Sequence, residues 1–204
     1  MKFMSKVTLT LSAGLLSQAL YASPVLMSTD VQDEFFDNLR QYCGQSFEGE
    51  VVEANWTGIE TFKDNRMVMH VRNCEEDRLE IPFHVGDNHS RTWILTKTGS
   101  GISLKHDHRK SNGEEDIDGG TMYGGHTQDA GWANAQSFPA DQASKEDFIR
   151  RRTPQSVGNT WHMFIYPGEF FSYRLTRPGR EMRVDFDLTN PVDTPPTPWG
   201  YEDN

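Results

Sequence analysis

Residues 78–108 read RLEIPFHVGDNHSRTWILTKTGSGISLKHDH, and this segment decides the fold. Apolar residues such as Ile81 and Phe83 alternate with polar ones. Residues two apart in a strand point to the same face of a sheet. Turn residues interrupt the alternation at 86–89 and at 99–101. The segment therefore predicts three consecutive antiparallel strands, each with one face toward a core.

The same period of two recurs on both sides of this segment. It marks the stretches 67–71, 162–166, 171–175 and 182–188, and almost no helical pattern lies between them. Short strands separated by frequent turns are typical of antiparallel all-β domains. We therefore expect one mainly β domain over residues 23–190, an antiparallel up-and-down β-barrel of lipocalin-like architecture. The alternative is a β-sandwich, which the same pattern allows.

One amphipathic helix is predicted before the strands. Apolar residues recur at steps near 3.6 between Val31 and Cys43, with charged residues on the other side. Thr29 is placed to cap its beginning, and Gly44 is placed as a left-handed stop. A helix of this kind cannot bury its apolar stripe alone, so we expect it to pack on one end of the barrel or to plug it.

The first residues predict export from the cytoplasm. Lys2 and Lys6 precede a mostly apolar stretch at 7–20, and small residues follow up to Ala22. This order of charge, apolar run and small residues is typical of a secretory signal peptide, here residues 1–22. The run is too short and too often interrupted by polar residues to span a bilayer. We expect a periplasmic or secreted protein without a transmembrane segment in the mature chain.

The charge balance excludes two classes of partner. The chain has 20 basic and 30 acidic residues, for a formal net charge of −10. An acidic surface repels phosphate backbones and anionic lipids, so nucleic acids and membrane surfaces are poor partners. The one basic cluster, residues 150–152, is too small to reverse this balance.

The two cysteines, Cys43 and Cys74, are predicted to form a disulfide. An exported chain meets an oxidising compartment, where an isolated pair is usually joined. No C-x-x-C spacing points to a redox or metal role. We interpret the bond as structural.

The motif His106-Asp107-His108 is the strongest candidate for chemistry. Both imidazoles would point to one face of a strand, about 7 Å apart, beyond the apolar residues of the same face. Two neutral imidazoles at a barrel mouth can bind a divalent transition metal such as zinc or copper, with His162 as the expected third ligand. Other histidines that could complete the set are His84, His89 and His126.

A second candidate is the segment TMYGGH at 121–126. Its two glycines allow positive φ or the close approach of a ligand beside Tyr123 and His126. We place these two residues, together with His106, His108 and His162, in a predicted ligand-binding site. A tight turn at the end of a strand explains the glycines equally well.

Two regions interrupt the strand pattern. Residues 111–140 are rich in glycine and acidic residues, so we expect a largely irregular segment with a short strand at 121–123. A brief helix capped by Ser144 is predicted to follow and to end before Pro154. The proline-rich residues 191–204 predict an extended C-terminal tail.

The sequence leaves three classes of function open. The first is an exported barrel that binds a small molecule or a metal ion through its histidine-bearing face. The second is a metal-dependent hydrolase or oxidoreductase that uses the same histidines. The third is a structural envelope protein without a ligand. The chain has no nucleophile elbow, no H-E-x-x-H, no phosphate loop and no dinucleotide fingerprint.

Four short segments resemble those of a family of uncharacterised bacterial secreted proteins. The segments are IPFHVG at 81–86, SRTW at 90–93, LKHDHR at 104–109 and PWG at 198–200. The resemblance extends over most of the mature chain and implies a bacterial exported domain. It implies no known activity and assigns no functional residue.

Overall fold

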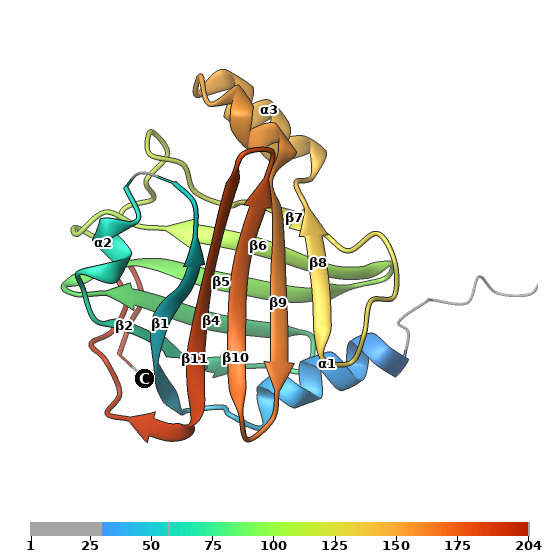
Figure 1. Cartoon of the computed structure of the whole chain (residues 1–204), viewed down its shortest axis with the longest axis vertical. Coiled ribbons are helices and arrows are strands. Elements are labelled where there is room, and N and C mark those ends of the chain that lie inside the picture. Colours follow the sequence, from blue (N-terminus) through green and yellow to red (C-terminus); the bar gives the residue numbers. More distant parts are fainter. Residues whose placement is uncertain (1–29, 57, 204) are drawn as a thin grey trace, which may run out of the picture.

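The computed structural model describes residues 30–56 and 58–203, which form an antiparallel sheet nearly closed into a barrel (Figure 1). The predicted mainly β fold is confirmed, and the barrel is found in place of the alternative sandwich. The predicted signal peptide at 1–22 and the predicted cap Thr29 lie outside the described residues.

Eleven strands make up the sheet. They are β1 (Ser46–Ala54), β2 (Met67–His70), β3 (Asn73–Cys74), β4 (Arg78–Val85), β5 (Asn88–Thr98), β6 (Gly101–His108), β7 (Tyr123–His126), β8 (Ala135–Pro139), β9 (Thr160–Tyr166), β10 (Phe170–Arg177) and β11 (Arg180–Val192). Ten of them follow the order β7-β6-β5-β4-β2-β1-β11-β10-β9-β8, and β3 pairs with β4 off this path. Neighbours along the chain are mostly neighbours in the sheet, which is up-and-down topology.

The barrel closes in two places. The first and last strands, β1 and β11, pair over most of the length of β1 and so lie side by side in one wall. The seam between β7 and β8 is held by an isolated bridge between Gly125 and Ala140. A Cβ atom on Gly125 would lie 2.2 Å from the carbonyl oxygen of Pro139, so the seam requires a glycine there.

The predicted N-terminal helix is present as α1 (Asp30–Arg40) and lies across one end of the barrel (Figure 1). It buries Phe35, Phe36 and Leu39 against the inner faces of the strands. Gly44, with a φ of 80°, follows as the predicted left-handed stop. The apolar stripe thus closes one end of the core, and burial of each large side chain contributes roughly 1.5–3 kcal/mol.

The predicted disulfide between Cys43 and Cys74 is also confirmed. It joins the turn after α1 to β3, which itself pairs with β4. The bond therefore fixes the helix at the closed end of the barrel.

Short helices surround the opposite end, which we call the mouth (Figure 1). They are α2 (Glu60–Lys63), α3 (Gln142–Arg150) and the 3-10 helix η1 (Pro154–Gly158). The predicted cap of α3 was wrong, because Asp141 is the N-cap and accepts a 2.8 Å hydrogen bond from Ser144 N. The Ser144 hydroxyl instead accepts from Gly124 N at 2.7 Å, which ties α3 to β7.

The segment 111–140 is more regular than its composition predicted. It contains both β7 and β8, and β7 begins at Tyr123 and not at Thr121. The apolar pattern does not predict β7, since Gly124 and Gly125 carry no apolar side chain that could show a period of two. They are needed because a Cβ on Gly124 would lie 1.9 Å from the Leu104 carbonyl oxygen.

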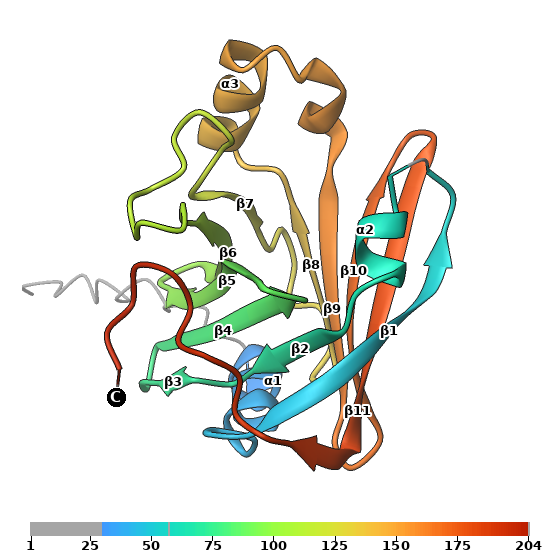
Figure 2. The same ribbon diagram turned by 90° about the vertical axis from the view of Figure 1, so that its left-hand side faces the viewer.

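The C-terminal tail packs against the outer face of the sheet and crosses several of its strands (Figure 2). Trp199 N donates to the carbonyl oxygen of His89 at 3.0 Å. The Tyr201 hydroxyl donates at 2.9 Å to Asp107, a carboxylate that is 1% exposed on the outer side of β6. Residues beyond β11 are thus extended, and they are bound to the barrel.

Candidate functional site

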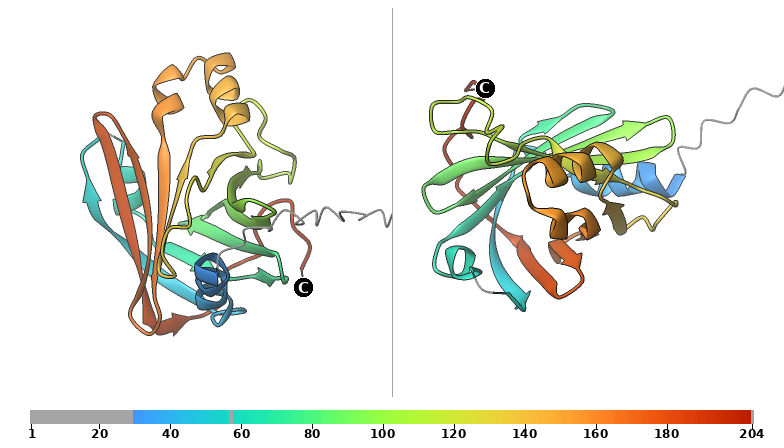
Figure 3. Two further views of the ribbon diagram at one scale, coloured as in Figure 1. Left: turned by 90° about the vertical axis from the view of Figure 1, so that its right-hand side faces the viewer. Right: turned by 90° about the horizontal axis from the view of Figure 1, so that it is seen from above.

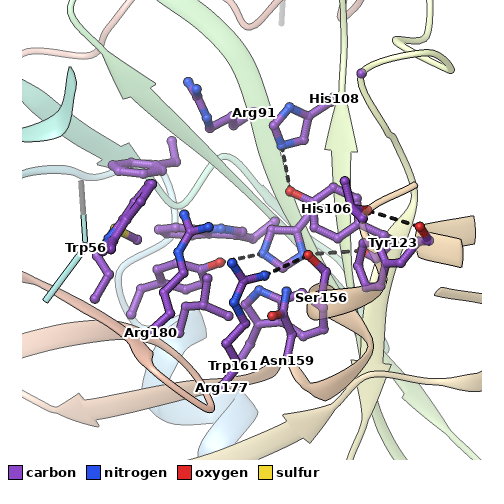
Figure 4. A pocket seen from close by; sticks show the side chains of 18 of the residues that line it. Trp56, Arg91, His106, His108, Tyr123, Ser156, Asn159, Trp161, Arg177 and Arg180 are labelled. Carbon is purple, nitrogen blue, oxygen red and sulfur yellow. Dashed lines mark hydrogen bonds between the residues drawn. The ribbon is translucent and has the colours of Figure 1, made fainter. Parts of the chain in front are cut away.

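A cavity of about 260 Å³ opens at the barrel mouth, above the packed core (Figure 4). Aromatic rings form much of its wall, because the inward positions of several strands end in aromatic residues at this level. Trp93 stacks on Tyr173 with 4.5 Å between ring centroids and on Phe83 with 4.8 Å. The aromatic side chains that line the cavity are Trp56, Phe62, Phe83, Trp93, Tyr123, Phe148, Trp161 and Tyr173.

Arginines supply the positive charge of the lining. Arg91, Arg151, Arg177 and Arg180 line the cavity, and its lining contains no aspartate or glutamate. Arg177 and Arg180 are the last Cα partners of the β10–β11 hairpin and directly flank its two-residue turn. The mouth therefore concentrates positive charge in a protein whose net charge is strongly negative.

Only part of this charge is balanced by the described residues. Arg151 pairs with Asp147, with 2.6 Å between Nε and Oδ2. Arg91, Arg177 and Arg180 form no ion pair with any carboxylate of residues 30–56 and 58–203. These three guanidinium groups carry uncompensated charge at the mouth.

Neutral groups make the contacts of these three arginines. Arg91 donates to the Asn88 side chain at 3.2 Å, and Arg177 donates to the Ser156 hydroxyl at 2.9 Å. Arg180 lies over the Trp56 ring. Burial lowers the pKa of Arg91 and Arg177; burial and then the charge of Arg177 lower the pKa of Arg180. A bound anion would offset both the burial and the mutual repulsion.

His106 lies at the floor of the cavity, 4% exposed, with both ring nitrogens engaged. Nδ1 lies 3.3 Å from the carbonyl oxygen of Tyr123, and Nε2 lies 2.8 Å from the Tyr173 hydroxyl. A carbonyl oxygen accepts only, so Nδ1 carries the proton and the Tyr173 hydroxyl donates to Nε2. Burial, followed by the proximity of His108, lowers the pKa of His106 to about 3.

His108 lies on the same inward face of β6, nearer to the rim (Figure 4). Its Nε2 is 3.2 Å from the Tyr123 hydroxyl. Burial and then the charge of Arg91 lower its pKa to about 4. Both histidines are therefore neutral at pH 7, and they offer hydrogen bonds without adding charge. The structure thus brings together His106, His108 and Tyr123, as the sequence predicted.

His162, the predicted third ligand, lies elsewhere. It is on the outer face of β9, since its neighbours Trp161 and Met163 are the ones that point into the core. Its ring nitrogens contact the Ser137 hydroxyl at 2.8 Å and the Thr176 hydroxyl at 2.9 Å. The predicted metal set of His106, His108 and His162 is therefore not assembled, because strand alternation places His162 on the other side of the wall.

The other candidate histidines are also outside the cavity lining. His126 contacts the Thr98 hydroxyl at 2.8 Å. His84 and His89 contact each other through their Nδ1 atoms at 2.7 Å. Across the described ranges, no cluster of three or more His, Cys, Asp or Glu side chains is placed to hold a metal ion.

Sequence reasoning missed the three arginines of the mouth that lack a carboxylate partner. The signal was present, because each lies two residues from an inward apolar residue and so extends an inward face. Arg91 precedes Trp93, Arg177 follows Leu175, and Arg180 precedes Met182. Apolar positions alone define the predicted inward faces, and they do not extend to the charged residues at the ends of the same strands.

No family model matches the chain, and no curated protein or solved structure is significantly similar to it. Within residues 30–56 and 58–203, no helix has the length and apolar character that a membrane span requires. The site must therefore be interpreted from its own chemistry.

Proposed function

We propose that the protein binds a small organic anion with an aromatic or other apolar body inside the barrel mouth. The observation that carries this proposal is the set of three cavity arginines without a carboxylate partner. Guanidinium groups bind carboxylates and similar oxyanions through two parallel hydrogen bonds. The aromatic wall supplies the apolar surface that such a ligand would bury.

The size and depth of the cavity support a small ligand. About 260 Å³ is near the lower end of the volumes of small-molecule sites, roughly 300–1,000 Å³. An anion held below the rim would be partly shielded from water, which strengthens its attraction to the arginines. The open volume also supports a ligand-binding protein over the structural envelope protein that the sequence left open.

The two histidines support a positioning role. As neutral groups hydrogen-bonded to tyrosines, they fix the Tyr123 and Tyr173 hydroxyls beside the cavity. Fixed neutral donors and acceptors orient a ligand without competing for its charge. The proposal therefore assigns affinity to the arginines and orientation to the histidine–tyrosine pairs.

Isothermal titration calorimetry with matched compounds tests this function. We expect benzoate to bind at pH 7 at least about tenfold more tightly than benzamide, because a charge-assisted hydrogen bond contributes about 1.5–3 kcal/mol. Replacing Arg177 with glutamine should remove this preference. The matched control is Arg174→Gln, on the outer face of the same strand, where Arg174 pairs with Glu181. Equal affinity for acid and amide, or an equal loss in the control, would exclude the proposal.

A further inference from the structure

Resting on the proposed function, we infer that the ligand carries two anionic groups at opposite ends of a flat apolar body. The arginines that lack a carboxylate partner are divided between two poles on different walls of the barrel. One pole is the pair Arg177 and Arg180. The other is Arg91 beside His108.

Strand register defines each pole. Arg177 and Arg180 are Cα partners across the β10–β11 hairpin, so two guanidinium groups start from adjacent points of one wall. Arg91 and His108 are Cα partners across β5 and β6. All four residues are on inward faces and line the cavity.

Sheet order places the two poles across the barrel from each other. β6 and β5 are second and third in the ten-strand order, and β11 and β10 are seventh and eighth. In a ring of ten strands, positions five apart are opposite. Seen from above, the two hairpins lie on different sides of the barrel (Figure 3), and the arginine side chains enter the cavity from both (Figure 4).

The first pole contains two hydrogen-bond donors without an acceptor. Arg180 Nε and Trp56 Nε1 are both buried without a hydrogen-bond partner. Buried donors are rarely left unpaired, because each costs about 1–3 kcal/mol. An anionic oxygen between them would accept from both and would also reduce the repulsion between Arg177 and Arg180.

The second pole has a different composition. Arg91 is held by Asn88 and lies 5.7 Å above the Phe62 ring, contacts that leave its charge unbalanced. His108 is neutral and adds no charge beside it. This pole therefore carries one positive charge, which one anionic group would balance. An anion at the first pole alone would leave the Arg91 charge partly buried and unpaired.

The space between the poles favours a flat molecule. The rings of Phe83, Trp93 and Tyr173 stack on one another at small angles, 20° and 23°, and this stack is part of the cavity wall. A planar body can lie against this wall with an anionic group at each end. The chemistry is that of an aromatic or unsaturated dicarboxylate.

Calorimetry on the wild-type protein with benzoate, terephthalate and phenyl phosphate tests this inference. Terephthalate has one carboxylate at each end, and phenyl phosphate has both charges at one end. We expect terephthalate to bind at least about tenfold more tightly than either of the other two. Replacing Arg91 with glutamine should reduce terephthalate affinity to that of benzoate, because only the first pole then holds an anionic group. Arg183→Gln, on the outer face of β11, is the matched control.

The outcomes separate the two proposals. If none of the three compounds binds, the proposed function fails and this inference fails with it. If benzoate binds as tightly as terephthalate, the function stands and the two-pole inference is overturned. If phenyl phosphate binds most tightly, the arginines act on a single head group, which also overturns the inference. The wild-type series decides among these results even where a variant does not fold.

Discussion

The guanidinium carbon of Arg180 lies 3.4 Å from the centroid of the Trp56 ring. The two residues are far apart in sequence. Arg180 begins β11, and Trp56 follows the end of β1, the strand that pairs with β11. The ring face attracts the cation, and both Trp56 Nε1 and Arg180 Nε are buried without a hydrogen-bond partner. Trp56 thus holds the charge of Arg180 at the cavity and carries a buried donor of its own.

The donor on Trp56 yields the first prediction. Trp56→Phe keeps an aromatic face under Arg180 but removes Nε1–H, so we expect benzoate to bind roughly 10- to 100-fold more weakly. The free energy of unfolding without ligand should not fall through loss of a hydrogen bond, because the removed donor is buried without a partner in the folded protein. Calorimetry and urea unfolding measure the two quantities. Unchanged benzoate affinity would show that Trp56 Nε1 does not contact the anion.

Acidification should destabilise the protein through its buried histidines. The pKa of His106 is about 3 and that of His108 about 4 in the folded state, against about 6.5 in the unfolded chain. Below pH 6.5 the unfolded chain therefore binds more protons than the folded protein. Stability then falls by roughly 1.4 kcal/mol per pH unit for each histidine until the folded pKa is reached.

His108→Gln tests how steeply the free energy of unfolding falls with pH, since glutamine does not titrate. We expect the free energy of unfolding, measured in urea from pH 6 to pH 4.5, to fall less steeply in the variant by roughly 1.4 kcal/mol per pH unit. Between pH 7.5 and pH 8.5 the two proteins should show the same slope, because both histidines are then neutral in both states. Parallel curves over the acidic range would contradict the lowered pKa of His108.

Divalent metals should not stabilise the protein through the histidine pair. Both nitrogens of His106 are already hydrogen-bonded, and His162 is on the outer face. A metal at 100 times its dissociation constant would stabilise the folded state by about 2.7 kcal/mol. We expect no such increase with zinc, copper or nickel in thermal unfolding. Stabilisation that is lost on replacing His106 and His108 with glutamine would restore the metal site that the sequence suggested.

The disulfide should contribute strongly to stability. The bond between Cys43 and Cys74 closes a loop with a sequence separation of 31 residues. Closing a loop of this length in the unfolded chain stabilises the folded state by about 3–4 kcal/mol in the chain-entropy model. We expect the double variant with serine at both positions to lose about this amount in urea unfolding. Intact mass before and after reduction and alkylation checks the bond itself; two free thiols in fresh protein would contradict it.

Much of the fold followed from local sequence patterns. The segment 78–108 alternates clearly because each of its strands has one face in the core, and α1 shows its stripe because it covers the end of that core. The strands β7 and β8 are harder to predict from the sequence. Glycines at the seam carry no apolar side chain, so close backbone approach replaced the pattern on which prediction depends.

The candidate site was predictable only in part. His106 and His108 share a face by strand alternation alone, and that inference needs no tertiary information. His162 has the same local signature, yet its face is fixed by Trp161 and Met163, whose burial a sequence pattern does not rank. Arg91 faces the same cavity as Arg177 and Arg180 only because the sheet curves into a barrel, and no local pattern contains that curvature.

The contact between Tyr201 and Asp107 yields the last prediction. Asp107 is buried on the outer side of β6 and accepts hydrogen bonds from Arg109, Thr121 and Tyr201. Tyr201→Phe keeps the ring but leaves the carboxylate with one donor fewer, so we expect a loss of about 1–3 kcal/mol in urea unfolding. Tyr166→Phe is the matched control, because Tyr166 is exposed on the outer face. Benzoate affinity should stay within about twofold of wild type, since Arg109 and Thr121 still hold Asp107 between the two histidines. A variant as stable as the control would show that the tail rests on the barrel without stabilising it.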